Sequence, residues 1–260
     1  MASPMASPRF WTRALVLMPA LALACCAPSR AEMPDSDAEA VRVADQVMKS
    51  LGGKDRWDHV VGLQWTFQTA SGDTMRPGRT HVWDKRTGMH RVEGKNRQGQ
   101  PFVMIHSMDG SLSKAWVNGV PIEGDSLAKL TKRAKSLWTN DTYWMLMPYK
   151  LRDPGVHLKY AGEAKDGKVT YDKLALSFDN VGETPGDHYW VYVNRANHRV
   201  EKWDYILQGQ SPPAETWTWE GWEQHDGLWF PTVHRNGSTT VYTHDVRTMS
   251  EVPPALFAGP

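Results

Sequence analysis

The spacing of hydrophobic residues is helical at the start of the chain and changes to alternation near residue 60. Over residues 35–51 one apolar stripe recurs every three or four positions, formed by Val41, Ala44, Val47, Met48 and Leu51. Ser36 and Glu39 have the spacing of a capping box, and Gly52-Gly53 follows as a C-terminal stop. This segment is predicted to be an amphipathic helix that packs against a larger element.

From Leu63 onward, alternation of apolar and polar residues predicts β-strands joined by tight turns. Leu63, Trp65 and Phe67 alternate with glutamine and threonine, and Asp-Gly, Thr-Gly and Asn-Gly pairs separate the later runs. A second helical stripe over residues 125–137 interrupts this pattern. Further strands are expected at about 79–84, 89–93, 102–106, 114–118, 157–163, 168–178, 188–194, 199–207, 216–224, 228–236 and 239–247.

The order of these elements favours one fold class. The strands follow one another at hairpin spacing, and the strand–helix–strand rhythm of a parallel sheet does not occur. We predict a mainly β protein with helices (α+β), in which a curved antiparallel sheet or unclosed β-barrel of about 10–12 strands wraps around two or more helices. Residues 32–260 are enough for a single domain with one core.

Residues 138–156, with the sequence WTNDTYWMLMPYKLRDPGV, combine aromatic rings and methionines with a few polar side chains. Pro148 and Pro154 exclude one continuous helix over this stretch. The polar side chains, expected to anchor it, are Asn140, Asp141, Lys150, Arg152 and Asp153. Such a segment is either a buried plug or the wall of an apolar site.

The first 31 residues have the features of an export signal. Two arginines precede an 11-residue apolar run over 14–24, which is shorter than the roughly 20 residues of a transmembrane helix. In one outcome, Cys25 or Cys26 becomes the lipidated first residue of a bacterial lipoprotein. In the other, cleavage after Ala24 or Ala31 releases a soluble protein. The expected location is the periplasm, or the outer membrane through a lipid anchor.

Composition narrows the possible partners and chemistry. The chain has 30 basic and 29 acidic residues, and this balance gives no electrostatic footprint for nucleic acid. Its two cysteines, Cys25 and Cys26, lie in the export segment, so a chain cut after Ala31 has no thiolate nucleophile, disulfide or cysteine metal ligand. The 13 tryptophans, each able to bury about 150–250 Å², supply more aromatic area than a hydrophobic content of 40% suggests.

Several short motifs are spread over most of the chain after residue 31. They are Trp138-x-Asn140-Asp141-x-Tyr143-Trp144, Pro148-x-Lys150-x-x-Asp153-Pro154-Gly155, Tyr171-Asp172-x-Leu174, Phe178-x-x-Val181-Gly182-x-Thr184-Pro185-Gly186-Asp187 and Tyr189-Trp190-Val191-Tyr192-Val193. These motifs resemble a family of bacterial exported proteins that is similar in fold to the periplasmic lipoprotein carriers, the LolA/LolB-like superfamily. The resemblance implies an unclosed antiparallel barrel around helices, with an apolar cavity that could take acyl chains. No binding residue is carried over, because no carrier motif matches a position of this sequence.

Catalytic and metal-binding alternatives rest on carboxylates and ten histidines, at positions 59, 81, 90, 106, 157, 188, 198, 225, 234 and 244. The histidines lack the spacing of a metal motif, and neither a metal nor another cofactor is expected, although His234 and His244 could meet on neighbouring strands. Asp141 or Asp153 with a histidine could serve an envelope hydrolase. We expect both carboxylates to serve local structure: Asp141 would cap a turn with Asn140, and Asp153 would begin an Asx turn.

The favoured hypothesis is a non-catalytic cell-envelope protein that binds a hydrophobic or lipid-like ligand, such as lipoprotein acyl chains. Methionine adapts to variable ligand shapes, and ligand pockets are mostly apolar. The candidate ligand-binding residues are Trp65, Phe67, Met104, Trp138, Trp144, Met145 and Met147. The alternatives are the hydrolase and a structural module whose helices plug the barrel. A monomer is expected, with membrane attachment only through an N-terminal lipid.

Overall fold

The computed structural model describes residues 36–179 and 186–260. The export segment with Cys25 and Cys26, and the Val181-Gly182-x-Thr184-Pro185 part of one motif, lie outside these residues. Three α-helices are described, α1 (Ala38–Ser50), α2 (Lys54–His59) and α3 (Gly124–Leu146). Two short 3₁₀ helices are η1 (Met147–Tyr149) and η2 (Pro254–Phe257).

Sixteen strands are described, and all their pairings are antiparallel. Nine of them form one sheet: β1 (Gly62–Ser71), β2 (Thr74–Met75), β3 (Arg79–Asp84), β4 (Met89–Lys95), β5 (Pro101–Ser107), β6 (Ser113–Val117), β7 (Val120–Pro121), β15 (Val233–Asn236) and β16 (Thr239–Met249). Five form a second sheet: β8 (Val156–Asp166), β9 (Val169–Phe178), β10 (His188–Asn194), β11 (Val200–Ile206) and β12 (Glu215–Thr218). The last two form a hairpin: β13 (Glu223–His225) and β14 (Leu228–Phe230).

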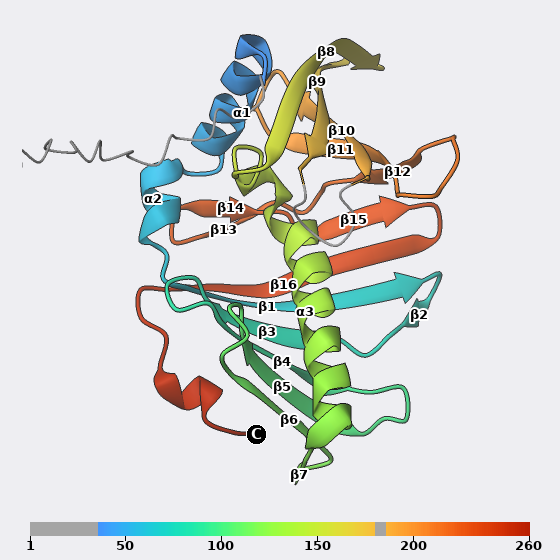
Figure 1. Ribbon diagram of the computed structural model, residues 1–260. Coiled ribbons are helices and arrows are strands. Elements are labelled where there is room, and N and C mark those ends of the chain that lie inside the picture. The colour runs from blue at the N-terminus through green and yellow to red at the C-terminus, as the bar shows by residue number, and fades with distance from the viewer. Residues whose placement is uncertain (1–35, 180–185) are drawn as a thin grey trace, which may run out of the picture. The chain divides into compact units, whose positions relative to one another are not determined.

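The strand order makes the two large sheets nearly continuous. The larger runs β15-β16-β1-β3-β4-β5-β6-β7, with β2 beside β1, and the smaller runs β12-β11-β10-β9-β8. Between β12 and β15, Glu220 and Val233 form an isolated bridge, and the backbone N–H of Arg235 donates to Thr218 Oγ1 at 3.1 Å. The result is a curved, unclosed antiparallel sheet with helices against it (Figure 1), and the predicted fold class is confirmed.

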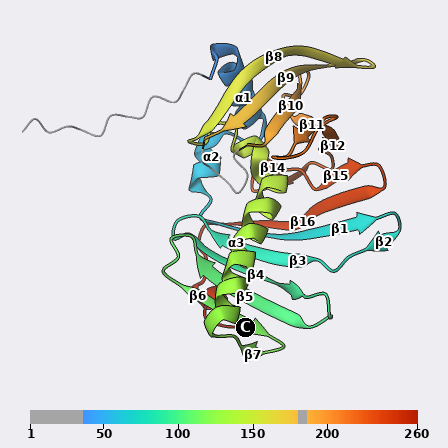
Figure 2. The ribbon, with the colours of Figure 1, turned by 45° about the vertical axis from the view of Figure 1, so that its right-hand side comes forward.

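One helix connects the two free edges of this sheet. α3 follows β7 at one edge and leads through η1 to β8 at the other (Figures 1 and 2). Its 23 residues extend about 34 Å at 1.5 Å per residue. We call the face of the sheet that α3 covers the inner face.

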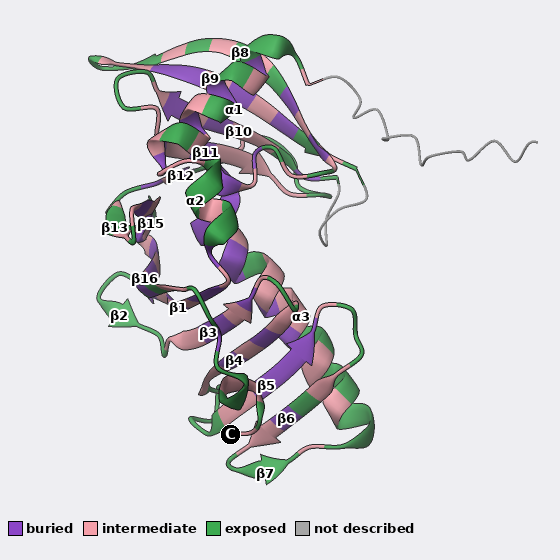
Figure 3. Cartoon of the chain, turned by 90° about the vertical axis from the view of Figure 1, so that its left-hand side faces the viewer, coloured by how far each residue is buried: buried purple, intermediate pink, exposed green. Residues whose placement is uncertain are grey.

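Two groups of buried apolar side chains lie under the helices. The main cluster joins α1, the C-terminal half of α3, η1 and strands of both large sheets, and its largest buried side chains include Trp65, Trp219 and Phe230. The second cluster lies between the N-terminal half of α3 and strands β4–β6, and consists of Val92, Met104, Ala115, Ala134 and Leu137. Figure 3 shows mostly exposed and intermediate residues along this half of α3, in agreement with the smaller size of the second cluster.

The long helix differs from the prediction at its C-terminal end. The apolar stripe predicts a helix over 125–137, but α3 continues to Leu146. The prediction that Asp141 caps a turn with Asn140 is wrong, because Asp141 lies inside the helix and bonds to side chains of β3. Pro148 does mark the end of the α-helix, since it lies in η1.

The start of α1 is fixed against the edge of β8. Asp37 caps the helix by accepting a hydrogen bond from the backbone N–H of Ala40 at 2.7 Å. Ser36, the predicted capping residue, instead accepts from the backbone N–H of Leu158 at 3.0 Å through its hydroxyl oxygen. The N-terminal residues therefore occupy part of the hydrogen-bonding edge that β8 would otherwise expose.

The end of α1 is fixed by its last carbonyl group. The carbonyl oxygen of Leu51 accepts hydrogen bonds from the backbone N–H of Trp229 at 3.0 Å and from the hydroxyl of Tyr149 at 3.1 Å. Gly52 follows with φ 114°, and its backbone passes directly beside Gly227 of the β13–β14 turn. Glycine is required here by both conformation and space.

Gly52 and its neighbour Gly53 give a matched pair of substitutions. A Cβ at Gly52 would lie 2.3 Å from the carbonyl oxygen of Gly227, whereas a Cβ at Gly53 (φ 89°) would meet nothing within 4 Å. We expect Gly53→Ala to lower the free energy of unfolding by about 1–3 kcal/mol, because φ 89° with ψ 154° is a backbone region that essentially only glycine occupies. Gly52→Ala should cost clearly more, because backbone must also shift. Urea unfolding followed by tryptophan fluorescence measures both, and equal losses would contradict the importance of the Gly227 contact.

Candidate functional site

Six of the seven predicted ligand-binding side chains belong to the main cluster or pack against it. Trp65, Phe67, Met145 and Met147 are buried members, and Trp138 and Trp144 are partly buried beside it. They come from β1, α3 and η1, which meet on the inner face. The structure thus brings these residues together, with most of their apolar surface in contact with protein.

The two α3 tryptophans of this set contact other rings. The ring centroid of Trp144 lies 4.9 Å from those of Trp203 and Trp217, in edge-to-face geometry. Trp138 makes an edge contact with Trp83 at 5.5 Å. Pairs of this kind contribute roughly 0.5–1.5 kcal/mol beyond the burial of their area. These rings therefore hold the C-terminal half of α3 on both sheets.

Met104, the seventh predicted residue, lies apart from the others, in the second cluster. The apolar neighbours packed against this cluster are only partly buried: Phe102, Ile122, Leu127 and Leu130. Among the α3 residues that precede Trp138, the buried ones are Ala134 and Leu137. This end of the inner face therefore has apolar side chains that the helix covers incompletely.

Three of the predicted polar anchors form ion pairs after α3. Lys150 Nζ contacts Asp153 Oδ2, and Arg152 Nη1 lies 2.9 Å from Asp45 Oδ1 on α1. All four side chains are about one-third exposed or more, and exposed pairs contribute about 0–1 kcal/mol each. They position the connection between η1 and β8 without adding much stability.

Asp141 differs from these anchors because its side chain is fully buried. Arg79 on β3 holds both carboxylate oxygens, with Nε 2.5 Å from Oδ2 and Nη2 2.6 Å from Oδ1. Asn140 Nδ2 donates to Oδ1 at 2.8 Å, and His81 Nε2 lies 2.9 Å from Oδ2. We call Arg79, Asn140 and Asp141 the Asp141 clasp. It attaches the helix to the sheet, because breaking it would leave a buried charge unpaired.

Two more buried histidines continue this polar contact across the sheet. His81 Nδ1 lies 3.0 Å from His90 Nε2, and His90 Nδ1 lies 3.0 Å from His106 Nε2. His106 Nδ1 lies 3.2 Å from the carbonyl oxygen of Ser107. The three rings come from the neighbouring strands β3, β4 and β5, and all have no exposed surface. We call His81, His90 and His106 the histidine ladder.

Burial governs the pKa values of these groups. Burial by itself raises the pKa of Asp141, but the hydrogen bonds and charges of His81 and Arg79 together hold it below the ordinary value of 3.8. Desolvation lowers the pKa of His81 and His106, and it lowers that of His90 well below 6.5. At neutral pH an ionised carboxylate therefore lies beside three neutral imidazoles.

The hydrolase alternative requires a carboxylate paired with a histidine, and Asp141 and His81 form such a pair. However, the Asp141 and His81 side chains have no exposed surface. The second ring nitrogen of His81 contacts His90 and not a hydroxyl nucleophile. Asp153, the other proposed carboxylate, pairs with Lys150. Over the described ranges, no group of three or more His, Cys, Asp or Glu side chains could hold a metal ion.

His234 and His244 do not meet as the sequence allowed. His234 stands opposite Val241 in the β15–β16 register and is buried. His244 Nδ1 lies 2.8 Å from Asp245, and its Nε2 lies 3.2 Å from Gln68 Oε1. The two rings therefore lie in different environments and do not form a common site.

The histidine ladder is not apparent from the sequence alone. The signal was available in part, because residues 81, 90 and 106 all fall within predicted strands of one meander. In the structure His90 stands directly opposite His106, and His81 lies diagonally beside His90, because His81 pairs with Val92. The register that aligns these rings depends on the lengths of the intervening turns, which alternation alone does not determine.

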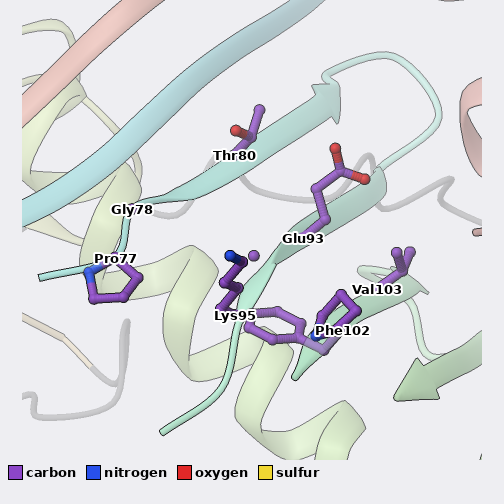
Figure 4. Close-up of a pocket in the computed structure, with 9 residues that line it drawn as sticks. Pro77, Gly78, Thr80, Glu93, Lys95, Phe102 and Val103 are labelled. Carbon is purple, nitrogen blue, oxygen red and sulfur yellow. The ribbon is translucent and has the colours of Figure 1, made fainter. Parts of the chain in front are cut away.

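A surface depression of about 580 Å³ lies on β3–β5 (Figure 4). Thr80, Glu93 and Val103 are successive cross-strand neighbours and line it, together with Lys95. Gly94 lies between them in the lining and contributes no side chain. The depression is open, and its lining combines two opposite charges with the apolar side chains of Pro77, Pro101, Phe102 and Val103. Phe102 also packs against the second cluster, so the depression borders that end of the sheet.

No helix among residues 36–179 and 186–260 is both long and apolar enough to cross a membrane.

Comparison with known proteins concerns the fold. No protein-family model matches the chain, and no curated protein matches it. The chain is similar to the crystal structure of a DUF1329 family protein from Desulfovibrio piger, with a TM-score of 0.48, 12% identity and coverage of 84% of this chain and 96% of that chain. It is also similar to a LolA superfamily protein from Nitrosomonas europaea, with a TM-score of 0.48, 12% identity and coverage of 84% and 97%. For the Mycobacterium tuberculosis lipoprotein LppX the TM-score is 0.27, with 11% identity and coverage of 82% and 98%. All three TM-scores are below 0.5 and the identities are 11–12%, so these similarities assign neither a superfamily nor a role to this chain.

Replacing the buried carboxylate by an amide of the same shape tests the Asp141 clasp. Asp141→Asn leaves the Arg79 charge without its anion, and we expect a loss of about 3–5 kcal/mol in the free energy of unfolding. Asp153→Asn, which removes a partly exposed pair with Lys150, is the matched control and should cost about 1 kcal/mol or less. Urea unfolding at neutral pH measures both. Similar small losses for the two variants would show that the clasp does not fix the helix.

His234 should contribute to the change of the free energy of unfolding with pH. Desolvation in the main core lowers its pKa to about 3, against an ordinary 6.5. Between these values the unfolded chain binds a proton that the folded chain does not. The free energy of unfolding therefore falls as the pH falls from about 6.5 to about 3, with up to about 1.4 kcal/mol per pH unit from this group.

We expect His234→Gln to reduce the slope of stability against pH between neutral and mildly acidic solution. His244→Gln, at a partly exposed ring on the next strand, should keep the wild-type slope. Urea unfolding at a series of pH values gives both slopes. A wild-type slope in the His234 variant would contradict the assignment.

Proposed function

We propose that this protein is a non-catalytic cell-envelope protein that binds a hydrophobic or lipid-like ligand on the inner face, between the N-terminal half of α3 and strands β4–β6. The supporting observation is the incomplete cover of the second cluster, where Phe102, Ile122, Leu127 and Leu130 remain partly exposed. A flexible apolar molecule would bury this surface. Each buried CH₂ group contributes about 0.8 kcal/mol.

The two halves of α3 are attached to the sheet by different contacts, and those of the N-terminal half include a hydroxyl contact between Thr131 and Ser113 of β6. The C-terminal half is attached by the Asp141 clasp and by the aromatic contacts of Trp138 and Trp144. The N-terminal half begins at Gly124 with φ 57°, and the residue before it, Glu123, makes no side-chain capping hydrogen bond. A ligand could therefore displace this half from β5 and β6 while the clasp keeps the rest of the helix in place.

Met104 lies at the base of the proposed contact. Its side chain is only 3% exposed, on the central strand of the three that face this half of the helix. The thioether is flexible and polarisable, and it can repack against chains of different shape. The other predicted ligand-binding residues, in the main cluster, would then form the closed end of the site.

Acyl chains, including those of lipoproteins, are the ligand class that this apolar and adaptable surface fits. The envelope location and the N-terminal lipid belong to the same proposal, since a carrier of acyl chains works between membranes. The ligand would leave unchanged, because the contact offers shelter from water and no reactive group. A plugged structural module remains the competing function, favoured by the burial of Trp65, Met145 and Met147.

Lipid binding is tested first on protein purified from cell envelopes. Native mass spectrometry and organic extraction should find a co-purifying lipid. A dansyl-labelled fatty acid should then bind to delipidated protein with increased fluorescence. Absence of both lipid and probe binding would contradict the proposal and favour the plugged module.

The position of the site is tested by Leu130→Gln. Loss of the apolar contact between Leu130 and the ligand should weaken the binding free energy by about 1.5 kcal/mol. We therefore expect about tenfold weaker binding of the dansyl probe. Met75→Gln, at a methionine that is 53% exposed on β2, is the control and should bind like wild type. Equal affinities of the two variants would place the site elsewhere.

A further inference from the structure

The histidine ladder has a hydrogen-bond acceptor at each end. One end is Oδ2 of Asp141, and the other is the carbonyl oxygen of Ser107. Four contacts connect them, at 2.9, 3.0, 3.0 and 3.2 Å. Each contact needs one hydrogen, and each neutral imidazole carries a single N–H. Three neutral histidines therefore leave one of the four contacts without a hydrogen.

The incomplete contact lies at the Ser107 end. Arg79 and Asn140 already bind Asp141 as an anion, so His81 donates its Nε2–H to the carboxylate. His90 must then donate its Nε2–H to His81, and His106 its Nε2–H to His90. This arrangement turns an unprotonated Nδ1 of His106 toward the carbonyl oxygen of Ser107, so that two acceptors face each other.

We propose that the histidine ladder is a buried binding site for one proton, which enters at His106 and leaves its charge on His81 beside Asp141. A proton from water adds to His106 Nδ1, and this N–H then donates to Ser107. The Nε2 proton of His106 passes to His90 Nδ1, and the Nε2 proton of His90 passes to His81 Nδ1. His81 becomes an imidazolium whose Nε2–H remains on Asp141. One proton has been gained, all four contacts hold a hydrogen, and no ring has moved.

The charges around the ladder decide where the added proton comes to rest. On α3, Asp141 attracts it to His81 and Lys135 opposes it at His106. On β3, Arg79 opposes it at His81 but is itself paired with the same carboxylate. His90 on β4 is affected by the other two rings. The ring that contacts an anion is His81, so the charge is most stable there.

The entry point lies near the surface. His106 is the residue before Ser107, and the Asp109–Ser111 turn that follows is exposed. Opening of this turn brings water to His106, while His81 and His90 stay enclosed by the helix and the sheet. The ladder thereby links the pH of the solution to a charge at the Asp141 clasp, without ligand or cofactor.

NMR of protein labelled with ¹⁵N-histidine tests this site directly, because ¹H–¹⁵N correlations identify the protonated ring nitrogen. Above neutral pH, all three ladder rings should carry their hydrogen on Nε2. On acidification, His90 and His106 should change to Nδ1–H and His81 should become doubly protonated, in a single step that takes up one proton. Three separate titrations in the folded protein, or retained Nε2–H forms until unfolding, would overturn the proposal.

His90→Gln breaks the path while keeping a donor and an acceptor at the centre of the ladder. A glutamine amide cannot accept a proton on one side and release one on the other, so His81 and His106 should no longer change together. His244→Gln, outside the ladder, should leave the concerted step intact. A concerted step that persists in His90→Gln would overturn the proposed path. Should this variant fail to fold, which circular dichroism would detect, the wild-type spectra decide alone.

Discussion

A carboxylate without access to water is the constraint on which the position of the long helix depends. Asp141 lies inside the protein as an anion, and an unpaired charge there would cost several kcal/mol. Its partner Arg79 lies on β3. Arg79 can bind both carboxylate oxygens only at one position of α3 along its axis and one rotation about that axis. Apolar side chains tolerate a small slide of the helix, whereas a bidentate ion pair does not. The clasp therefore sets the register of helix on sheet, and apolar packing supplies the stability around it.

Most of the strands could be predicted from the sequence because alternation is a local property. A strand with one face on a core repeats every two residues wherever it lies in the fold. The C-terminal half of α3 could not be predicted in this way. Asn140 and Asp141 locally favour a turn, and only distant partners on β3 make a polar pair acceptable inside a buried helix. The histidine ladder could not be predicted for a related reason. It depends on how three strands align across the turns between them.

The candidate ligand-binding residues can be named from the sequence, but the clusters to which they belong cannot. Trp65 and Met104 look alike in sequence, as apolar residues on strands, yet they belong to different clusters. An apolar residue that faces a ligand and one that faces the core obey the same burial rule, so sequence alone does not separate them. The distinction lies in the surroundings: Trp65 is a member of the large main cluster, whereas Met104 belongs to a small cluster whose apolar neighbours are only partly buried.

The pairing of β1 has a consequence for how the molecule forms. β1 is bordered by β3, its near neighbour in sequence, and by β16, from the far end of the described chain. Closing so long a loop carries a large entropic cost, and topologies built on such distant pairs fold slowly. Until β16 arrives, one edge of β1 presents free backbone donors and acceptors to any other strand it meets. The chain is therefore most prone to aggregation during synthesis, between the time when β1 emerges and the time when β16 emerges and pairs with it.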